Sequence, residues 1–190
     1  MNLSQARAYA DKIVKWLDPY CERIEVAGSI RRERPICNDV DLVVIPKSEH
    51  KTDLLGAIES QRNLLHEFLT GYVADQDGKA HWLAGQEKPD GRNLLLQLPR
   101  CQLDIFCATT QTFGSLLLCR TGSKEHNIWL ASRATRFCCH WFIYAGLKVG
   151  GDAIASHCLI AHSEEAIYEA LKLPWIPPQE RELSSLRRFN

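Results

Sequence analysis

The residues best suited to chemistry in this sequence are two aspartates separated by a single valine, Asp39 and Asp41, at the start of the apolar run 42–45. In an extended strand alternate side chains point to the same face, so we expect both carboxylates on one side and Val40 in the core. Mg²⁺ prefers oxygen ligands and often completes its shell with the phosphates of a substrate. The pair therefore predicts a site for a divalent cation and a phosphate compound.

A Gly-Ser pair lies upstream, after the apolar stretch 24–27 that predicts a strand, and Ser29 stands ten residues before Asp39. Glycine lets the backbone approach a phosphate closely, and the following amides together with Ser29 and Arg32 can bind anionic oxygens. A D-x-D pair alone also occurs in surface turns with solvated charges. The combination with G-S-x-R-R at this spacing favours the phosphate site over that alternative.

A third carboxylate, Asp104, is the polar break in the apolar segment 101–107. If that segment lies beside the strand that begins at Asp39, Asp104 joins Asp39 around one ion, next to an attacking hydroxyl. In such two-metal sites one ion activates the hydroxyl, the other holds a triphosphate, and pyrophosphate leaves in line. Taken alone, Asp104 would be a charge on an edge strand; the first motif favours the catalytic interpretation.

These motifs together resemble the catalytic part of the family X DNA polymerases, the group that includes DNA polymerase beta. The similar segments run nearly the length of the chain: G-S-I-R-R at 28–32 with D-V-D at 39–41, L-D-I at 103–105, T-G-S-K-E-H-N at 121–127, and an ending at 164–171 and 175–182. The resemblance implies an α+β fold. Residues 1–110 would form a nucleotidyltransferase palm with a mixed β-sheet and covering helices, and residues 111–190 a small α/β lobe, the thumb or fingers, that selects the nucleotide.

The resemblance also implies an activity, that of a DNA-directed DNA polymerase that extends a primer 3′-hydroxyl and releases pyrophosphate, in the repair of gaps or breaks. Asp39 and Asp41 would hold two Mg²⁺ or Mn²⁺ ions, and Asp104 would complete the ion at the hydroxyl. The implied nucleotide-binding residues are Gly28, Ser29, Arg32, Asn38, Cys119, Arg120, Thr121, Gly122, Ser123, Lys124 and Asn127. Arg133 and Arg136 would contact DNA, with a solvated helical face as the alternative.

Several positions depart from the family pattern. Only 27 residues precede Gly28, so we expect a minimal form without the helical lyase domain or the helix-hairpin-helix region. Cys119 and Arg120 stand where the family often has two aromatic residues that check the sugar, and the smaller Cys119 predicts weaker discrimination against ribose. Arg120 is either a solvated charge at a helix end or a phosphate contact. Ala131 stands where some relatives carry a template-contacting arginine, which predicts lower fidelity.

Charge and cysteine content fit a small intracellular enzyme. Lys and Arg number 23 and Asp and Glu 23, but the segment 111–148 is locally basic. Because overall charge is low, we expect a partner such as a DNA ligase or an end-binding protein to add affinity for the primer-template. Eight cysteines without an apolar leader predict a reducing, cytoplasmic setting, with nuclear or viral origin left open, and a monomer with no membrane span. The Cys138-Cys139-His140 cluster is expected to consist of structural thiols rather than zinc ligands.

Apolar spacing and turn residues predict the elements that position these motifs. Helices are expected over 3–17, with Ser4 as N-cap, over 51–69, 112–118 and 124–136, and after the N-cap Ser163. Strands are expected at 24–27, from Asp39 to Pro46, at 72–74, 81–84, 93–98 and 102–107, and as a hairpin of 146–152 with 157–161. The short Asp77-Gly78 turn stands where template-independent relatives insert a long loop, which favours templated synthesis.

Two other functions fit the same motifs. One is a terminal or other-acceptor nucleotidyltransferase, because the G-S and D-x-D pattern is shared across that wider group. The other is a catalytically inactive nucleotide- or DNA-binding module. The T-G-S segment argues against the first alternative, and the presence of all three aspartates argues against the second.

Overall fold

The structure is a computed structural model that describes residues 1–52, 58–88, 91–149 and 158–182. The helices are α1 (Leu3–Leu17), α2 (Gly28–Arg31), α3 (Leu64–Ala74), α4 (Phe113–Thr121), α5 (Lys124–Arg136) and α6 (Glu164–Ala170), with short 3-10 turns η1 (Asp18–Tyr20) and η2 (Pro178–Glu180). The strands are β1 (Cys21–Val26), β2 (Asp39–Pro46), β3 (Ser48–Thr52), β4 (Ile58–Asn63), β5 (His81–Ala84), β6 (Asn93–Gln97), β7 (Gln102–Cys107), β8 (Cys139–Phe142), β9 (Gly146–Val149) and β10 (Cys158–Ile160).

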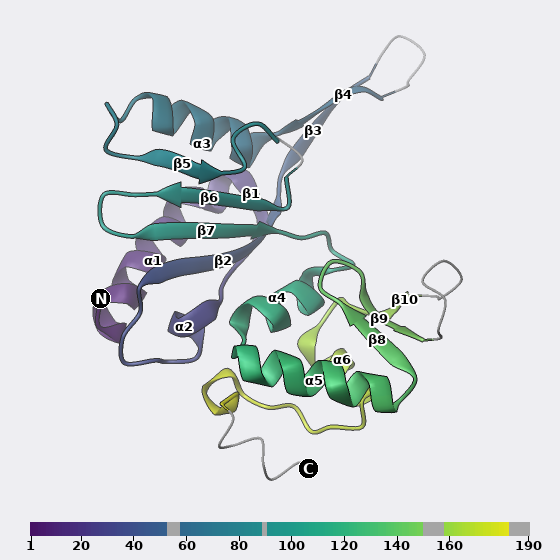
Figure 1. The fold of residues 1–190 in the computed structure, drawn as a ribbon. Coiled ribbons are helices and arrows are strands. Elements are labelled where there is room, and N and C mark those ends of the chain that lie inside the picture. Colours follow the sequence, from purple (N-terminus) through teal and green to yellow (C-terminus); the bar gives the residue numbers. More distant parts are fainter. Residues whose placement is uncertain (53–57, 89–90, 150–157, 183–190) are drawn as a thin grey trace.

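A mixed sheet organises the first lobe, which we define as residues 1–107. Its strand order is β1-β2-β7-β6-β5, with β2 and β7 parallel and the other neighbours antiparallel. Alternate residues of β2 and β7 are buried, and these pack with α1 and α3 on one face of the sheet (Figure 1). Helices together with a mixed sheet confirm the predicted α+β class.

The second lobe, residues 113–182, combines α4, α5 and α6 with the sheet β10-β9-β8. Its own apolar cluster includes Leu118 of α4, Leu130 of α5 and Tyr168 of α6. A further cluster joins the lobes, because Val43 and Phe106 of the first sheet pack with α4. The division of function near residue 110 stays a prediction, and apolar contacts cross it.

Several predicted elements hold and others do not. The strands at 81–84, 93–98 and 102–107, the helices from residue 113 onward and the N-cap Ser163 are all present, and β9 pairs with β10 as expected. Part of that predicted hairpin, residues 150–157, lies outside the described residues. Helix α1 begins after Asn2 rather than Ser4, because the Asn2 side chain accepts from the Gln5 amide at 2.9 Å.

The helix predicted over 51–69 is wrong. The chain forms the antiparallel pair β3 and β4 there, and α3 begins only at Leu64, with Asn63 as its N-cap. The strand predicted at 72–74 is also wrong, because those residues continue α3, which buries Leu65 and Leu69 against the sheet. Strand β8 was not expected from the sequence; it follows α5 after Cys138, whose φ of 55° ends the helical path.

Candidate active site

Asp104 was expected to join Asp39, but the register of the sheet makes Asp41 its direct cross-strand neighbour. Strands β2 and β7 pair in parallel with Asp41 opposite Asp104 and Asp39 opposite Gln102. The neighbours Val40 and Leu103 are fully buried, so the aspartates occupy the opposite face from the aliphatic core. The segment 101–107 therefore lies beside the first strand as expected. Asp41 is the direct cross-strand neighbour of Asp104, and Asp39 follows on the same face.

Crowding of these carboxylates makes negative charge costly at this face. Burial, then the neighbouring Asp39 and Asp104, raise the pKa of Asp41 to about 7, while Arg32 and Arg120 act in the opposite direction. Burial also raises the pKa of Asp104, against a hydrogen bond from Gln102 Nε2 to Asp104 Oδ1 at 2.7 Å. A bound cation would stabilise the charged form of closely spaced, partly buried carboxylates of this kind.

The carboxylate oxygens suit a hard cation whose coordination shell is completed by other ligands. Within the described residues, no cluster of three His, Cys, Asp or Glu side chains is arranged to hold one ion. Asp41 and Asp104 offer carboxylate oxygens, which Mg²⁺ and Mn²⁺ accept, and Mg²⁺ commonly takes one or two protein carboxylates together with substrate phosphates. The residues present therefore fit a metal that binds together with its substrate.

Glycine is required beneath Asp41. Gly28 has a φ of +57°, and a Cβ added to it would lie 1.8 Å from Asp41 Oδ2. The missing side chain is what allows the Asp41 carboxylate to lie against the first turn of α2. The next residue, Ser29, carries a buried hydroxyl with no hydrogen-bond partner in the part of the chain that the structure describes. Asn38 is exposed at the start of β2.

A cavity of about 640 Å³ opens where the two lobes meet. Eight of the predicted site residues line it: Arg32, Asp41, Asp104, Cys119, Arg120, Gly122, Lys124 and Asn127. Five further residues complete the lining: Phe106, Ile128, Ala131, Trp141 and Ile143. The carboxylates come from the sheet of the first lobe and most of the apolar side chains from the second, so a ligand here would meet acidic, basic and apolar groups together.

Arg120 lies against the sheet instead of extending into solvent. Its guanidinium carbon is 3.8 Å from the centre of the Phe106 ring, and its Nε atom is buried without a hydrogen-bond partner among the described residues. It also acts on the pKa of both Asp41 and Asp104. This placement beside the carboxylates favours a contact with an anionic ligand over a solvated charge.

Cys119 and Asn127 form one unit in the cavity wall. Asn127 Nδ2 donates to the Cys119 carbonyl oxygen at 2.8 Å, which links the end of α4 to the first turn of α5. Burial raises the pKa of the Cys119 thiol. Cys119 therefore presents a small, neutral side chain at the position where the family often has an aromatic residue that checks the sugar.

Thr121 and Ser123, predicted to contact a nucleotide, are buried and bonded within the protein. Thr121 Oγ1 accepts from Arg31 Nη1 at 2.7 Å, and the Thr121 carbonyl accepts from Arg32. Ser123 Oγ accepts from the His126 amide at 3.2 Å as the N-cap of α5. These residues hold the frame of the site, and only Gly122 between them lines the cavity.

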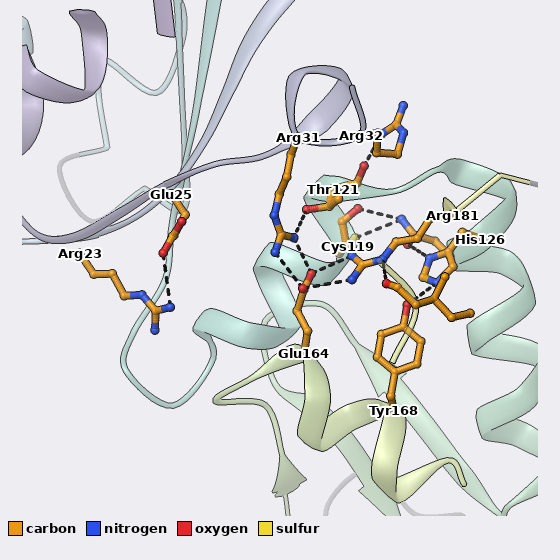
Figure 2. A network of polar contacts seen from close by, with 12 residues as sticks. Arg23, Glu25, Arg31, Arg32, Cys119, Thr121, His126, Glu164, Tyr168 and Arg181 are labelled. Carbon is orange, nitrogen blue, oxygen red and sulfur yellow. Dashed lines mark hydrogen bonds and ion pairs between the residues drawn. The ribbon is translucent and has the colours of Figure 1, made fainter. Parts of the chain in front are cut away.

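A buried ion-pair network joins the lobes (Figure 2). Glu164 accepts from Arg31 at 2.7 and 2.9 Å and from Arg181 at 2.8 and 3.1 Å. Burial would raise the pKa of Glu164, but the hydrogen bonds from Arg31 and Arg181 outweigh it and lower that pKa to about 2. The glutamate therefore stays ionised and connects α2, α6 and the segment at residue 181.

His126 lies beside this network in the second lobe, and its Nε2 atom is 2.8 Å from the Tyr168 hydroxyl. Burial and the charge of Arg181 lower the pKa of His126 to about 4. Sequence reasoning assigned no role to Arg181 or Tyr168. Both residues lie in the C-terminal segments that resemble the family, and that resemblance was the signal available for them.

The two arginines predicted to contact DNA lie on α5 outside the cavity. Arg133 stacks over Phe137 at 5.3 Å with a buried Nε atom that has no partner among the described residues, and Arg136 is exposed. A role in DNA contact stays a prediction for both. In the vicinal pair, Cys139 is buried, Cys138 is exposed, and both are free thiols.

A family model provides independent support for a relationship. Residues 116–182 match the model named DNA polymerase beta thumb. A search of curated proteins finds no match. The matched segment covers most of the second lobe and indicates a DNA-binding, polymerase-like relative of the DNA polymerase beta kind; it does not include the aspartates. Among the described residues, no helix is both long and apolar enough to cross a membrane.

Proposed function

We propose that this chain, with its thumb related to that of DNA polymerase beta, is a metal-dependent DNA polymerase of the family X type. The observation that carries the proposal is the pairing of Asp41 with Asp104 in the wall of a cavity that the thumb-related lobe completes. A binding module would have no need for two crowded carboxylates whose charge opposes folding. The substrates would be a DNA primer-template and a nucleoside triphosphate.

The residues divide the work by charge. Asp41 and Asp104, with Asp39 further along the same face, would share two Mg²⁺ or Mn²⁺ ions whose coordination shells are completed by oxygens of the substrates. Such ions would neutralise phosphate charge and lower the pKa of an attacking hydroxyl. Arg32, Arg120 and Lys124 line the same cavity and supply positive charge for the triphosphate. In the transfer, the primer 3′-oxygen bonds to the α-phosphorus, the bond to pyrophosphate breaks, and the hydroxyl proton passes to solvent.

The wall at Cys119 bears on sugar selection. A pocket rejects an added hydroxyl mainly through steric crowding or an unpaired polar group. Cys119 lines the cavity with a small thiol, and its carbonyl is already bonded to Asn127. We therefore expect weakened discrimination against ribonucleotides, and a preference for deoxyribonucleotides above about a thousandfold would contradict this.

Primer extension tests the proposal directly. A labelled primer is incubated with and without template, with each deoxy- and ribonucleotide supplied separately, and with Mg²⁺ or Mn²⁺. Template-directed addition that is lost in Asp104→Ala supports a polymerase. Untemplated addition would instead indicate a terminal transferase, and no addition despite nucleotide binding would indicate another acceptor or a binding role.

We also propose a role in the repair of gaps or breaks, as a monomer that works beside a DNA ligase or an end-binding protein. Pull-down of such a partner with DNA ends, compared with intact duplex, is the corresponding measurement.

A further inference from the structure

Arg32 lines the cavity beside Asp41 and is held in place from the second lobe. Its Nη1 atom donates to the Thr121 carbonyl oxygen (Figure 2), and its Nε atom donates to Glu182 Oε1 at 3.3 Å. Gly122 packs closely against the same guanidinium, because a Cβ on that glycine would lie 3.0 Å from Nη1. Among the described residues no atom accepts a hydrogen bond from Arg32 Nη2, so this part of the group is left for a ligand.

Glu182 does not compete with a ligand for space in the cavity. Arg32 belongs to the cavity lining, whereas Glu182 lies outside it. The Arg32 and Glu182 side chains are 17% and 29% exposed, so water screens their attraction only in part. A carboxylate in this position fixes the direction of the remaining guanidinium donors and leaves the place of a phosphate free.

Glu182 also balances two arginines that lie close together. Its Oε1 atom is 3.4 Å from Arg34 Nη1 as well as 3.3 Å from Arg32 Nε. Glu33, between the two arginines in the chain, has a φ of 58°, and the chain bends there so that both guanidinium groups reach the same carboxylate. Since like charges repel, removal of the Glu182 charge would leave the two arginines to push each other apart and would release the Arg32 side chain.

We propose that Glu182 is a positioning residue, which holds Arg32 so that Nη2 meets the triphosphate of an incoming nucleotide. This inference rests on the proposed function and gives a role to a residue outside the cavity. A long side chain that is already ordered before binding loses less conformational freedom when its ligand arrives. Glu182 would therefore lower the free-energy cost of triphosphate binding without touching the substrate.

Equilibrium binding of a nucleotide tests this role without catalysis. The probe is a non-hydrolysable deoxynucleoside triphosphate analogue, titrated into the full chain with Mg²⁺ present. Glu182→Gln keeps the shape of the side chain and removes its charge. Because Arg32 must then be ordered at the moment of binding, the Kd should rise about three- to tenfold. Glu182→Asp keeps the charge but shortens the side chain by one methylene, so it should raise the Kd as well.

The sign of the change separates positioning from a simple effect of charge. Glu182 is an anion near an anionic ligand, so the loss of its charge alone would lower the Kd for a triphosphate. An effect of charge alone would also leave Glu182→Asp like the wild type. A higher Kd in both variants is expected only if the contact with Arg32 matters.

A double-mutant cycle with Arg32→Ala identifies the residue through which Glu182 acts. Glu182→Gln should have no further effect in a protein that lacks the Arg32 side chain, whereas an unrelated structural disturbance would add its own loss. In primer extension, Glu182→Gln should raise KM for the nucleotide and leave kcat nearly unchanged, because the ordering cost is the same in the ground state and the transition state. Equal melting temperatures would show that the variants are folded.

Glu125→Gln is the matched control, because it removes one negative charge from the first turn of α5. Hydrogen bonds from its own amide and from Ser123 lower the pKa of Glu125, and the charges of Lys124 and Arg32 act in the same direction. Glu125 therefore senses the charge of Arg32, but among the described residues it makes no hydrogen bond or ion pair with it. This variant should bind the analogue within about twofold of the wild type or more tightly.

Two results would overturn the role of Glu182 alone. One is a Kd in Glu182→Gln that is within about twofold of the wild type or below it, and the other is an equal loss with and without the Arg32 side chain. A wild-type protein that binds no triphosphate would overturn this role together with the proposed function. If the wild type binds the analogue but does not extend a primer, the proposed function fails by itself, and the Kd values still decide the role of Glu182.

Discussion

The polar motif residues of the two lobes are used in different ways. In the first lobe, Asp41 and Asp104 stand on the face of a rigid sheet and line the cavity. In the second lobe, Lys124 and Asn127 line the same cavity, whereas Thr121 and Ser123 are buried and bonded to other parts of the protein. The adjacent residues Arg31 and Arg32 show the same division within one motif, because only Arg32 lines the cavity. A single sequence motif thus contains both groups that line the cavity and groups that hold the frame.

The largest effect on activity is expected from the residues that line the cavity. Asp104→Asn keeps the shape of the side chain and removes its charge, so the fold should be retained. Because a metal-binding carboxylate supports several kcal/mol of transition-state stabilisation, primer extension should fall about a thousandfold or more. Single-turnover extension and nucleotide binding measure the two effects separately. Extension near the wild-type rate would remove Asp104 from the catalytic set.

The buried residues that join the lobes should affect stability instead. Glu164→Gln leaves Arg31 and Arg181 without a charged partner, and breaking a buried ion pair in this way costs about 3–5 kcal/mol. Urea unfolding measures the loss. The matched control is Glu165→Gln on the same helix, where the side chain is exposed and the expected change is within about 0.5 kcal/mol. Equal losses in the two variants would contradict the role given to the network.

Substitutions at two glycines distinguish backbone strain from crowding of the Asp41 carboxylate. Ala at Gly78 meets no atom within 4 Å but must adopt a φ of +79°, so Gly78→Ala should cost about 1–2 kcal/mol and leave activity unchanged. Gly28→Ala carries a similar backbone cost and also displaces Asp41. It should therefore lose extension activity as well. Unfolding and extension assays on both variants test the difference, and an active Gly28→Ala would oppose it.

The smallest effect near neutral pH is expected from acidification. His126 takes up a proton at its ordinary pKa of 6.5 when unfolded but only at about 4 when folded, so its own contribution to stability falls as pH drops below about 6.5. Asp41 acts in the opposite direction over this range, because its folded pKa of about 7 lies above its ordinary value of 3.8. Glu164 has a folded pKa of about 2 against 4.5, so a further loss begins below about pH 4.5. Urea unfolding across this range measures the slope. His126→Gln should lose less stability, or gain more, than the wild type between about pH 6.5 and 4, and an identical pH dependence in the two proteins would exclude a contribution from His126.

Much of the first lobe could be predicted from the sequence because its signals are local. Alternation along β2 and β7 fixes which side chains share a face, and the polar break at Asp104 in an apolar run marks its strand. Ser163 before two glutamates gave the start of α6 correctly. These patterns depend only on strand and helix geometry, so they survive without knowledge of the neighbours.

The errors fall where local signals are weak or where distant segments meet. The polar sequence around β3 and β4 carries no alternation, and the apolar residues of α3 drew the predicted helix too far upstream. The roles of these ion-pairing residues depend on contacts that no local pattern shows. Glu164 meets Arg31, which lies 133 residues away in the sequence, and Arg181, which lies 17 residues away. Nor could any spacing rule have shown that Thr121 faces inward.

Arg181 also bears on how the protein is made. Glu164 can meet Arg31 once α6 has left the ribosome, but it gains its second guanidinium partner only after residue 181 has been synthesised and has emerged. Until then a carboxylate in the seam between the lobes has half of its final partners. The joint between the lobes is therefore completed only after residue 181 has emerged, whereas the strands that carry Asp41 and Asp104 come earlier in the chain.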